Sequence, residues 1–360
     1  MKFELQDQRL AGPLGNLDRR RDLFANLPLD PTHAHWLKKR AWVRTIHGTT
    51  RIEGNTLSDV EVEGLLAGAA ARSVSQREAR EIIGIREALG LVDELAVRPV
   101  PIDEGVIREV HRRILWGQSP LLTAGEYRRG ENRVVDSAGQ PVFSTPPSGD
   151  VPELMRAFSA WLGSTAAGHA APVAAALAHL EFVAIHPFND GNGRCARALS
   201  RLLLVRGDFA FDGLVALDAQ FDLDRTAYFA AIRESIGPTY APGYDATAFV
   251  LYFLESSVKA ADHVLARIRG LGMVLTEVRR SIADRSLPAP MIDGLAFAWL
   301  NRHIRAADYI GFTGRSPQST TRDLARAVEA GWLVPVGEKR GRYYVLGPRL
   351  LDVPASGEIP

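Results

Sequence analysis

The sequence predicts a mainly α-helical protein with two small β elements. Apolar residues recur at helical spacing along most of the chain, and capping residues mark the starts of several of these stretches. Segments that combine β-branched residues with a turn-rich tip occur at residues 132–143 and 333–345. Because the helical segments are long and numerous and the strand-like ones are short, we expect helices to form the core.

The composition narrows the class of protein. The chain has 360 residues, enough for two or three domains, with a formal charge of +1 and 46% apolar residues. This balance argues against a strongly basic nucleic-acid-binding protein. Cys195 is the one cysteine, which excludes an internal disulfide and a cysteine-based metal cage. Residues 1–21 contain no apolar signal core, and no apolar run reaches membrane-spanning length, so we expect a cytoplasmic protein without a membrane partner.

Helix signals divide the chain in order. Residues 1–28 are expected to be a loosely ordered lead-in. Asp30 and Pro31 have the pattern of an N-cap and a first helical residue, and the apolar spacing after them predicts a helix that runs toward Glu53 and stops at Gly54. Further helices are expected at residues 58–66, 78–95, 103–114, 151–162, 173–185, 196–205, 222–232 and 244–284.

A short β-hairpin is expected over residues 132–143, between Asn132 and Phe143. Two apolar segments there flank the turn-rich residues 136–140. From the residues alone it is either an ordinary surface hairpin or, because an exposed strand edge is otherwise a liability, a surface that pairs with another chain.

The C-terminal part predicts a separate domain. The proline-containing residues 286–290 form a credible boundary. Beyond them the pattern is a helix over 291–302, a shorter one ending near Tyr309, a third over 316–330, and two strands at 333–336 and 342–345, which together suggest a winged helix.

This C-terminal domain has two candidate roles. Arg322, Arg326 and the basic tip at residues 339–341 are suited to contact phosphates of DNA. Such domains also serve in docking to other proteins or in dimerisation. In the second case the protein would be a homodimer. DNA binding is not favoured because the whole chain is not basic.

Residues 186–197, with the sequence HPFNDGNGRCAR, concentrate chemistry in one stretch. His186 can accept a proton near neutral pH, and the carboxylate of Asp190 is a hard oxygen ligand suited to Mg²⁺. Gly191 and Gly193 let the backbone turn tightly and expose its N–H groups. The Leu-rich run that follows predicts a helix, whose N-terminus would hold an anion such as phosphate.

Three arginines follow at helical spacing. Arg194, Arg197 and Arg201 recur at i, i+3 and i+7, which places them on one helical face as candidate phosphate clamps. Together with the preceding residues they indicate phosphoryl or nucleotidyl transfer. The alternatives are a glycine-rich turn before a surface helix, and a thiol nucleophile at Cys195, for which no third orienting group is evident.

The same stretch resembles the signature of Fic-domain proteins, His-x-Phe-x-Asp/Glu-Gly-Asn-Gly-Arg-x-x-Arg, and matches it at every specified position. The resemblance implies a mainly α fold: a Fic helical core with a small hairpin flap, plus the winged-helix-like domain. It also implies transfer of AMP from ATP to a protein hydroxyl. The domains are then expected at 1–100 (helices with an inhibitory motif), 101–260 (Fic catalytic core), 261–285 (helical linker) and 286–360 (winged-helix-like domain).

The resemblance also implies roles for individual residues. His186 would be the base, Phe188 an anchor of the loop, and Arg197 the partner of the γ-phosphate. Mg²⁺ would be held by Asp190. The phosphates of ATP would be bound by Gly191, Asn192, Gly193 and Arg194.

Two further contacts are implied. Tyr228 lies in a segment similar to the one that closes over the nucleoside, which makes it a candidate adenine or ribose contact. The flap at residues 132–143 would pair with an extended segment of the protein substrate. His179, on the helix expected at 173–185, is expected to be a hydrogen-bonded core residue.

Residues 49–54 resemble the inhibitory motif of Fic proteins, Ser/Thr-x-x-x-Glu-Gly/Asn, with Thr49, Glu53 and Gly54 at the defining positions. From the residues alone a solvated Glu53 is preferred, although an acidic residue at a helix C-terminus opposes the helix dipole. The resemblance implies instead an ion pair between Glu53 and Arg197 in the seat of the γ-phosphate.

The leading prediction is a protein adenylyltransferase that also modifies itself and is inhibited by Glu53. Doc-type relatives, which phosphorylate, carry Lys where this chain has Gly193, so that reaction is disfavoured. Two alternatives remain, a de-AMPylating enzyme and a nucleotide-sensing DNA-binding regulator. The target protein and the acceptor type, Tyr, Thr or Ser, stay open.

Overall fold

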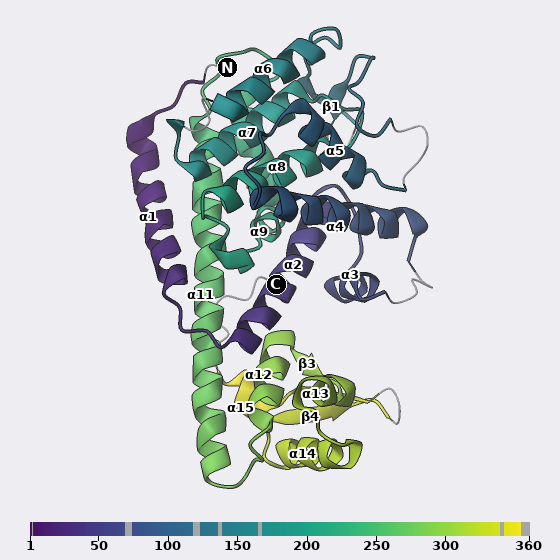
Figure 1. Ribbon diagram of the computed structural model, residues 1–360, viewed down its shortest axis with the longest axis vertical. Coiled ribbons are helices and arrows are strands. Elements are labelled where there is room, and N and C mark those ends of the chain that lie inside the picture. Colours follow the sequence, from purple (N-terminus) through teal and green to yellow (C-terminus); the bar gives the residue numbers. More distant parts are fainter. Residues whose placement is uncertain are drawn as a thin grey trace. The chain divides into compact units, whose positions relative to one another are not determined.

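The computed structural model of the protein describes residues 1, 3–68, 74–117, 123–135, 139–164, 168–338 and 342–353 (Figure 1). The chain divides into two compact units. Unit 1 comprises Met1–Leu27 and Arg40–Ala260, and unit 2 comprises Pro28–Lys39 and Ala261–Pro360. Within the described residues, none of the helices has both the length and the apolar character that crossing a membrane requires.

The first element of unit 1 corrects an expectation. Residues 1–28 were expected to be loosely ordered, but α1 (Asp7–Ala25) is a helix of 19 residues. Leu10 and Leu17, seven residues apart, are buried on one side of it. Phe24 packs against Phe211, with ring centroids 4.9 Å apart. These few apolar contacts hold α1 against the rest of unit 1. They were not recognised in the sequence because the segment is mostly polar.

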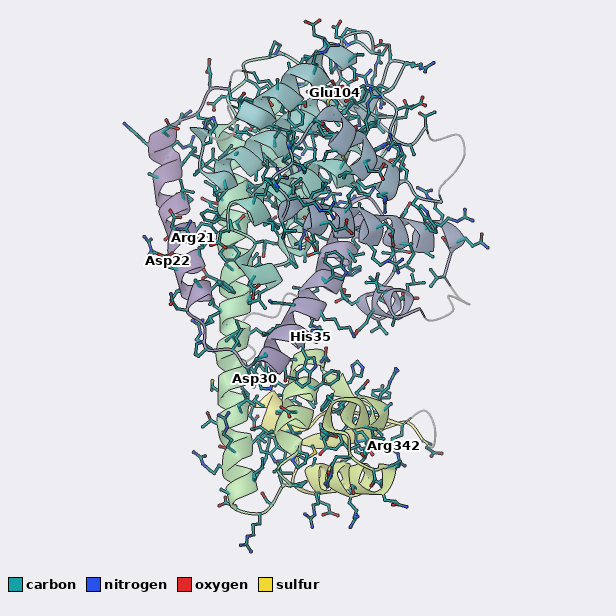
Figure 2. The ribbon with its side chains drawn as sticks, in the orientation of Figure 1. Arg21, Asp22, Asp30, His35, Glu104 and Arg342 are labelled. Atoms are coloured by element: carbon teal, nitrogen blue, oxygen red, sulfur yellow. The ribbon has the colours of Figure 1, made fainter. Side chains whose placement is uncertain are left out.

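The next four helices lie where the sequence predicts them. These are α2 (Pro31–Ile52), α3 (Asp59–Leu66), α4 (Gln76–Ala96) and α5 (Glu104–Ile114). Of these, α4 begins two residues earlier than expected, after the N-cap Ser75. Asp30 lies at the start of α2 (Figure 2), where its Oδ1 accepts a hydrogen bond of 2.8 Å from the N–H of Thr32. Gly54 has φ of 95°, so it ends the helix in a conformation suited to glycine. Ser58 and Glu61 form the expected capping box.

Unit 1 continues with α6 (Val151–Ser164), α7 (Ala171–Ile185) and α8 (Asn192–Arg206), of which α7 and α8 are the most buried. The alanine-rich α7 is buried on nearly all sides, as predicted, and α8 packs along it (Figure 1). The unit is completed by the 3₁₀ turn at Phe211–Gly213, α9 (Leu217–Leu223), α10 (Arg225–Ile236) and the first part of α11 (Thr247–Ala283). A central apolar helix therefore ends at the loop that carries the signature residues.

The predicted hairpin is present as the antiparallel pair β1 (Arg133–Val135) and β2 (Pro141–Ser144), with Val134 opposite Phe143. Its tip at residues 136–138 lies outside the described residues. The backbone of Ser144 makes two further hydrogen bonds of 2.9 Å, to the carbonyl of Pro238 and from the N–H of Tyr240. β2 is therefore held from both sides, and β1 lies at the outer edge.

Unit 2 contains helices followed by a small antiparallel sheet. The elements are α12 (Met291–Asn301), β3 (His303–Ile304), α13 (Ala306–Thr313), α14 (Pro317–Glu329), β4 (Leu333–Val336), β5 (Tyr343–Leu346) and α15 (Pro348–Leu351). The sheet order is β3-β5-β4. The two-residue β3 was not predicted, because its partner strand lies 40 residues away in the sequence.

The core of unit 2 includes the start of α2. The ring of Trp36 packs against Phe297 and Phe312, with centroids 5.2 and 5.1 Å apart. Arg322 and Arg326 are exposed on α14, whereas the basic tip at residues 339–341 lies outside the described residues. The winged-helix assignment and a nucleic-acid role for this unit stay predictions.

Two glycines on α4 allow a test of how closely α4 and α5 pack. A Cβ atom added at Gly84 would lie closer than 3.0 Å to the carbonyl oxygen of Ile114, whereas one at Gly90 would meet nothing within 4 Å. We therefore expect Gly84→Ala to lower the free energy of unfolding by about 2 kcal/mol. Gly90→Ala should raise it by up to about 1 kcal/mol, because alanine favours the helix. Urea unfolding of both variants measures the difference, and equal effects would contradict the close packing.

Candidate active site

The signature residues form a tight loop between α7 and α8. His186 ends α7 in the left-handed conformation, with φ of 51°, and Gly191 begins α8 with φ of 77°. A left-handed conformation is costly for a residue that carries a Cβ, so the surroundings must hold His186 in place.

Side chains from α5, from α8 and from the loop itself fix the backbone of this loop. The amide of Asn192 binds both backbone groups of Phe188: its Oδ1 accepts from the N–H at 2.9 Å and its Nδ2 donates to the carbonyl at 2.8 Å. The ring of Phe188 is fully buried and stacks on His111 with centroids 3.6 Å apart. His111 Nε2 lies 2.9 Å from the carbonyl oxygen of Asp190, and its Nδ1 accepts from the N–H of Gly125 at 2.8 Å. The loop is therefore rigid before any ligand binds.

His186 is arranged as a neutral base. Its Nδ1 lies 3.2 Å from the carbonyl oxygen of Val183, which accepts only if Nδ1 carries the proton. Nε2 is then the nitrogen free to accept a proton. Burial lowers the pKa of His186 to about 4, and the nearby charge of Arg128 acts in the same direction. The imidazole is therefore neutral at pH 7, with a proton on Nδ1 and none on Nε2.

The first turn of α8 presents backbone donors. The first intrahelical bond runs from the N–H of Cys195 to the carbonyl of Gly191 at 2.9 Å, which leaves the N–H groups of residues 192–194 outside the helical ladder. A Cβ added at Gly193 would lie closer than 3.0 Å to Oε1 of Glu53. The carboxylate of Glu53 thus sits at the N-terminus of α8, where the helix dipole favours an anion.

Glu53 forms an ion pair with Arg197, as the resemblance implied. NH2 of Arg197 lies 2.6 Å from Oε1 of Glu53, and the same guanidinium donates to Oγ1 and to the carbonyl of Thr49 at 2.7 and 3.0 Å. Burial disfavours both charges, yet Arg197 and then Arg194 hold the pKa of Glu53 below its usual value, and Glu53 holds the pKa of Arg197 above its own. Glu53 is therefore ion-paired, although 34% of its side chain remains exposed to solvent.

Tyr228 lies behind Arg197, fully buried. Its hydroxyl is 3.4 Å from NH1 of Arg197 and 2.7 Å from Nε2 of His179, and burial raises the pKa of Tyr228 to about 12. His179 also contacts Oγ of Ser200 at 3.3 Å, which agrees with the expected core role of this histidine. The expected contact of Tyr228 with a nucleoside finds no support here, because only 1% of the residue is exposed.

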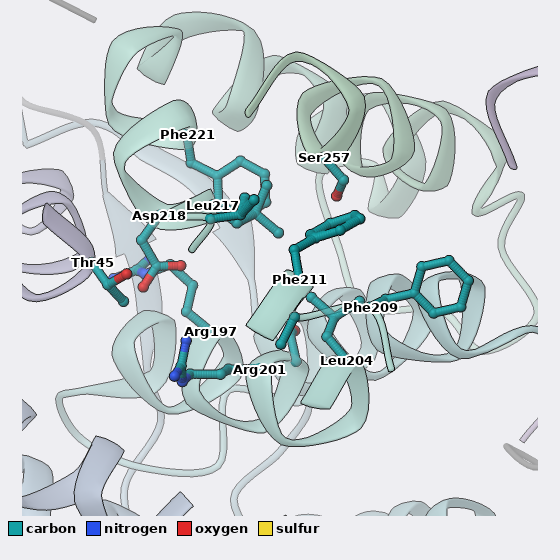
Figure 3. Close-up of a pocket in the computed structure, with 13 residues that line it drawn as sticks. Thr45, Arg197, Arg201, Leu204, Phe209, Phe211, Leu217, Asp218, Phe221 and Ser257 are labelled. Carbon is teal, nitrogen blue, oxygen red and sulfur yellow. The ribbon is translucent and has the colours of Figure 1, made fainter. Parts of the chain in front are cut away.

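A cavity lies beside Arg197. Its lining combines the polar side chains of Thr45, Asp218 and Arg201 with the rings of Phe211 and Phe221 (Figure 3). Its volume of about 40 Å³ has room for a few water molecules and not for a nucleoside.

Asp190 is the candidate metal ligand. Its Oδ1 accepts from the N–H of Gly191 at 2.6 Å and from NH2 of Arg194 at 3.1 Å, and 44% of its side chain is exposed. In the described part of the chain, no group of three His, Cys, Asp or Glu side chains is placed to hold a metal ion. One partly exposed carboxylate suits Mg²⁺ only if other oxygens, such as phosphates and water, complete the shell.

One expectation drawn from α8 is corrected, and one alternative is excluded. Arg201 was grouped with Arg194 and Arg197 as a phosphate clamp, but its NH2 binds Oδ1 of Asp93 at 3.0 Å and its guanidinium lies over the ring of Trp42. Arg201 lies on the third turn of α8, too far from the helix N-terminus to reach an anion bound there. Cys195 is fully buried, and burial raises the pKa of its thiol, so a thiol nucleophile is excluded in this arrangement.

Sequence reasoning missed Arg128 and His111. Both are buried, and both bind backbone carbonyls of the loop across 58 and 79 residues of sequence. Their roles depend on tertiary contacts, and local sequence contains little signal: His111 lies on the amphipathic α5, and Arg128 lies in irregular backbone before β1.

The ion pair predicts a pH-dependent effect on stability. We expect Glu53→Gln to lower the free energy of unfolding by about 1–2 kcal/mol at pH 7, a modest figure because 34% of the Glu53 side chain is exposed. Since the pKa of Glu53 is depressed, its contribution is present above its ordinary pKa of 4.5 and is lost as the pH falls further. Urea unfolding between pH 3 and pH 7 tests this.

The exposed Glu255 on α11 provides the control for this measurement. Glu255→Gln should change stability by less than about 0.5 kcal/mol at either pH. A Glu53→Gln effect that stays constant from pH 7 to pH 3 would contradict the ion pair.

Comparisons with known proteins relate part of this chain to one protein family. Residues 101–204 match the model of the Fic/DOC family. Proteins named "Protein adenylyltransferase Fic" from Drosophila ananassae and Drosophila melanogaster are 35% identical over 198 residues, which is 54% of this chain and 38% and 39% of theirs. The chain thus spans about two fifths of the length of these curated relatives.

Solved structures show the same fold. A Fic family protein from Desulfovibrio desulfuricans has a TM-score of 0.62 at 21% identity, covering 97% of this chain and 98% of that one. Residues 134–508 of Fic-1 from C. elegans have a TM-score of 0.59 at 27% identity, covering 71% and 72%. The residues that match the Fic/DOC family model, 101–204, contain the hairpin, the loop between α7 and α8 and most of α8.

Proposed function

We propose that the chain is a protein adenylyltransferase, which transfers AMP from ATP to a Tyr, Thr or Ser hydroxyl of a protein. The observation that carries this proposal is the neutral imidazole of His186 in the loop before the first turn of α8, whose N–H groups lie outside the helical ladder and which carries two buried arginines, Arg194 and Arg197. The identity of 35% with proteins named as adenylyltransferases supports it.

The geometry suits nucleotidyl transfer. Nε2 of His186 takes the proton from the attacking hydroxyl, whose oxygen then bonds to the α-phosphorus of ATP while the bond to the pyrophosphate breaks. The N–H groups of residues 192–194, together with Arg194 and Arg197, stabilise the charge on the phosphates. The side chain of Asn192 is already bound to Phe188, so this residue contributes its backbone N–H to the anion.

Asp190 fits a magnesium ion that is shared with the nucleotide. Its exposed carboxylate would be the protein's ligand, and the bound ion would neutralise charge on the phosphates. The hydrogen bonds from Gly191 and Arg194 orient the carboxylate for this role.

The hairpin fits the binding of an extended segment of the protein substrate. Within the described residues β1 pairs only with β2, so its outer edge offers backbone groups to another strand. Val135 on this edge is 54% exposed. Docking there would align the acceptor hydroxyl with the loop that follows α7.

Glu53 would inhibit this reaction. Its carboxylate occupies both Arg197 and the N-terminus of α8, which are the groups that a triphosphate needs. Two anions in one seat repel each other, so ATP would bind without its γ-phosphate on Arg197. The 34% exposure of the Glu53 side chain leaves it able to move away from the seat.

We expect Glu53→Gly to raise the rate of self-labelling by α-labelled ATP at least about tenfold, because Arg197 is then free to bind phosphate. Gel autoradiography over a time course measures the rate. Glu255→Gly, which removes an exposed carboxylate from α11, is the control and should leave the rate unchanged. Equal rates for Glu53→Gly and the wild type would contradict the inhibitory role.

We expect His186→Ala in the Glu53→Gly background to lower AMP transfer by at least about 100-fold, since the general base is lost. The thermal unfolding curve should keep its shape, because the imidazole is half-buried and bonded to one carbonyl. His35→Ala, which removes an exposed histidine of unit 2, serves as the control. Undiminished labelling in His186→Ala would refute the base.

A second candidate activity is removal of AMP from a modified protein. The carboxylate of Glu53 beside Gly193 favours it, since a carboxylate at the N-terminus of α8 is placed to orient a water molecule. Incubation of the wild-type chain with its AMP-modified Glu53→Gly form, followed by measurement of free AMP, separates the two directions.

A further inference from the structure

Arg128 binds three separate carbonyl groups with one buried guanidinium. Its Nε donates to the carbonyl of His186 at 2.9 Å, NH1 to that of Gly130 at 3.2 Å, and NH2 to that of Pro146 at 2.6 Å. Only 2% of the residue is exposed. A buried guanidinium with fixed planar donors sets the relative positions of the groups that it binds.

The three carbonyls belong to two functional segments. Gly130 lies just before β1 and Pro146 just after β2, so Arg128 holds the two ends of the hairpin together. The hydroxyl of Thr145 donates to the carbonyl of Asn132 at 2.8 Å and closes the same base. The third carbonyl is that of His186 itself. One side chain therefore joins the hairpin to the signature loop.

The backbone at Arg128 strengthens this connection. Its N–H donates to the carbonyl of Pro187 at 2.9 Å, so residues 186 and 187 are both bound. His186 is held at φ of 51°, a conformation that a non-glycine residue adopts only when its surroundings compensate for the strain. A charge-assisted hydrogen bond to its own carbonyl provides that compensation.

The charge of Arg128 also affects the imidazole. Burial is the main cause of the low pKa of His186, and the positive charge of Arg128 lowers it further, whereas Glu53 and Asp190 act in the opposite direction. A nearby cation disfavours a second positive charge on the ring.

We propose that Arg128 is a positioning residue. It holds the backbone of His186 in the left-handed conformation and fixes the position of His186 relative to the hairpin that is proposed to bind the protein substrate. This inference rests on the proposed function for its catalytic meaning, because it takes His186 to be the base. The positioning itself is a property of the structure and can be measured without activity.

The test compares variants at Arg128 with the same variants at Arg129 in the Glu53→Gly background. The Arg129 side chain is 91% exposed and pairs with Glu126 at 3.8 Å, so it is a neighbouring arginine without these contacts. Arg128→Lys keeps the charge but loses the planar donors, whereas Arg128→Gln loses the charge as well. Thermal unfolding identifies any variant that fails to fold, in which case Arg128→Lys decides.

Two readouts are expected to change. The rate constant of self-labelling by α-labelled ATP should fall at least about tenfold in Arg128→Lys, because misplacing the base slows the chemical step. The ATP concentration that gives half the maximal rate should stay within about twofold of that of the Glu53→Gly parent. Arg128 contacts none of the groups proposed to bind the phosphates, which are Arg194, Arg197 and the N–H groups of residues 192–194. Arg129→Lys should match the parent in both.

NMR titration of the His186 imidazole, assigned by loss of its signal in His186→Gln, gives the second readout. In Arg128→Gln its pKa should rise above about 4 but stay below 6.5, because burial remains the main cause of the shift, and in Arg128→Lys its ring signals should shift while the pKa moves less. Arg129→Gln should leave the titration unchanged.

Full labelling rate and an unchanged His186 signal in both Arg128 variants would overturn the proposal. If no form of the chain transfers AMP, the proposed function fails, and the titration still decides whether Arg128 positions His186. A rate that falls only through a raised ATP requirement would also overturn it, because that result assigns Arg128 to nucleotide binding.

Discussion

The arrangement of the site depends on the need of the buried Arg197 guanidinium for an anion. Its side chain is 1% exposed, and a charge so far from water is stable only when paired and hydrogen-bonded. In this structure Thr49 and Glu53, at the end of α2, supply the acceptors, and the hydroxyl of Tyr228 lies behind. In the proposed function, the γ-phosphate of ATP and the carboxylate of Glu53 compete for this one cation. Binding of ATP and inhibition by Glu53 therefore both depend on the charge of Arg197.

The rigidity of the signature loop complements this competition. Every anchor of the loop is internal: Asn192 binds Phe188, His111 binds the carbonyl of Asp190, and Arg128 binds that of His186. A rigid loop fixes the imidazole and the helix N-terminus before a ligand arrives, which favours catalysis by preorganised charge. The partly exposed Glu53, by contrast, is attached through a helix end. The part of the site proposed to regulate can therefore move while the part proposed to catalyse stays fixed.

Many helix starts and the anion site at the N-terminus of α8 were predictable from local sequence. Caps such as Asp30, Ser58 and Asp103 marked helix starts, and the glycines and arginine after His186 indicated an anion site, because these signals act over a few residues. The helical nature of α1 and the pairing of Arg201 with Asp93 were not predictable in this way. They depend on partners more than 100 residues distant, such as Phe211 for Phe24, and spacing along one helix does not show which neighbour lies opposite.

The most direct measurement is a pair of crystal structures with ATP and Mg²⁺, one of the wild-type chain and one of the Glu53→Gly variant. The proposed competition predicts that the γ-phosphate contacts Arg197 in the variant and is excluded from it by Glu53 in the wild type. A triphosphate seated on Arg197 in the same way in both structures would contradict it.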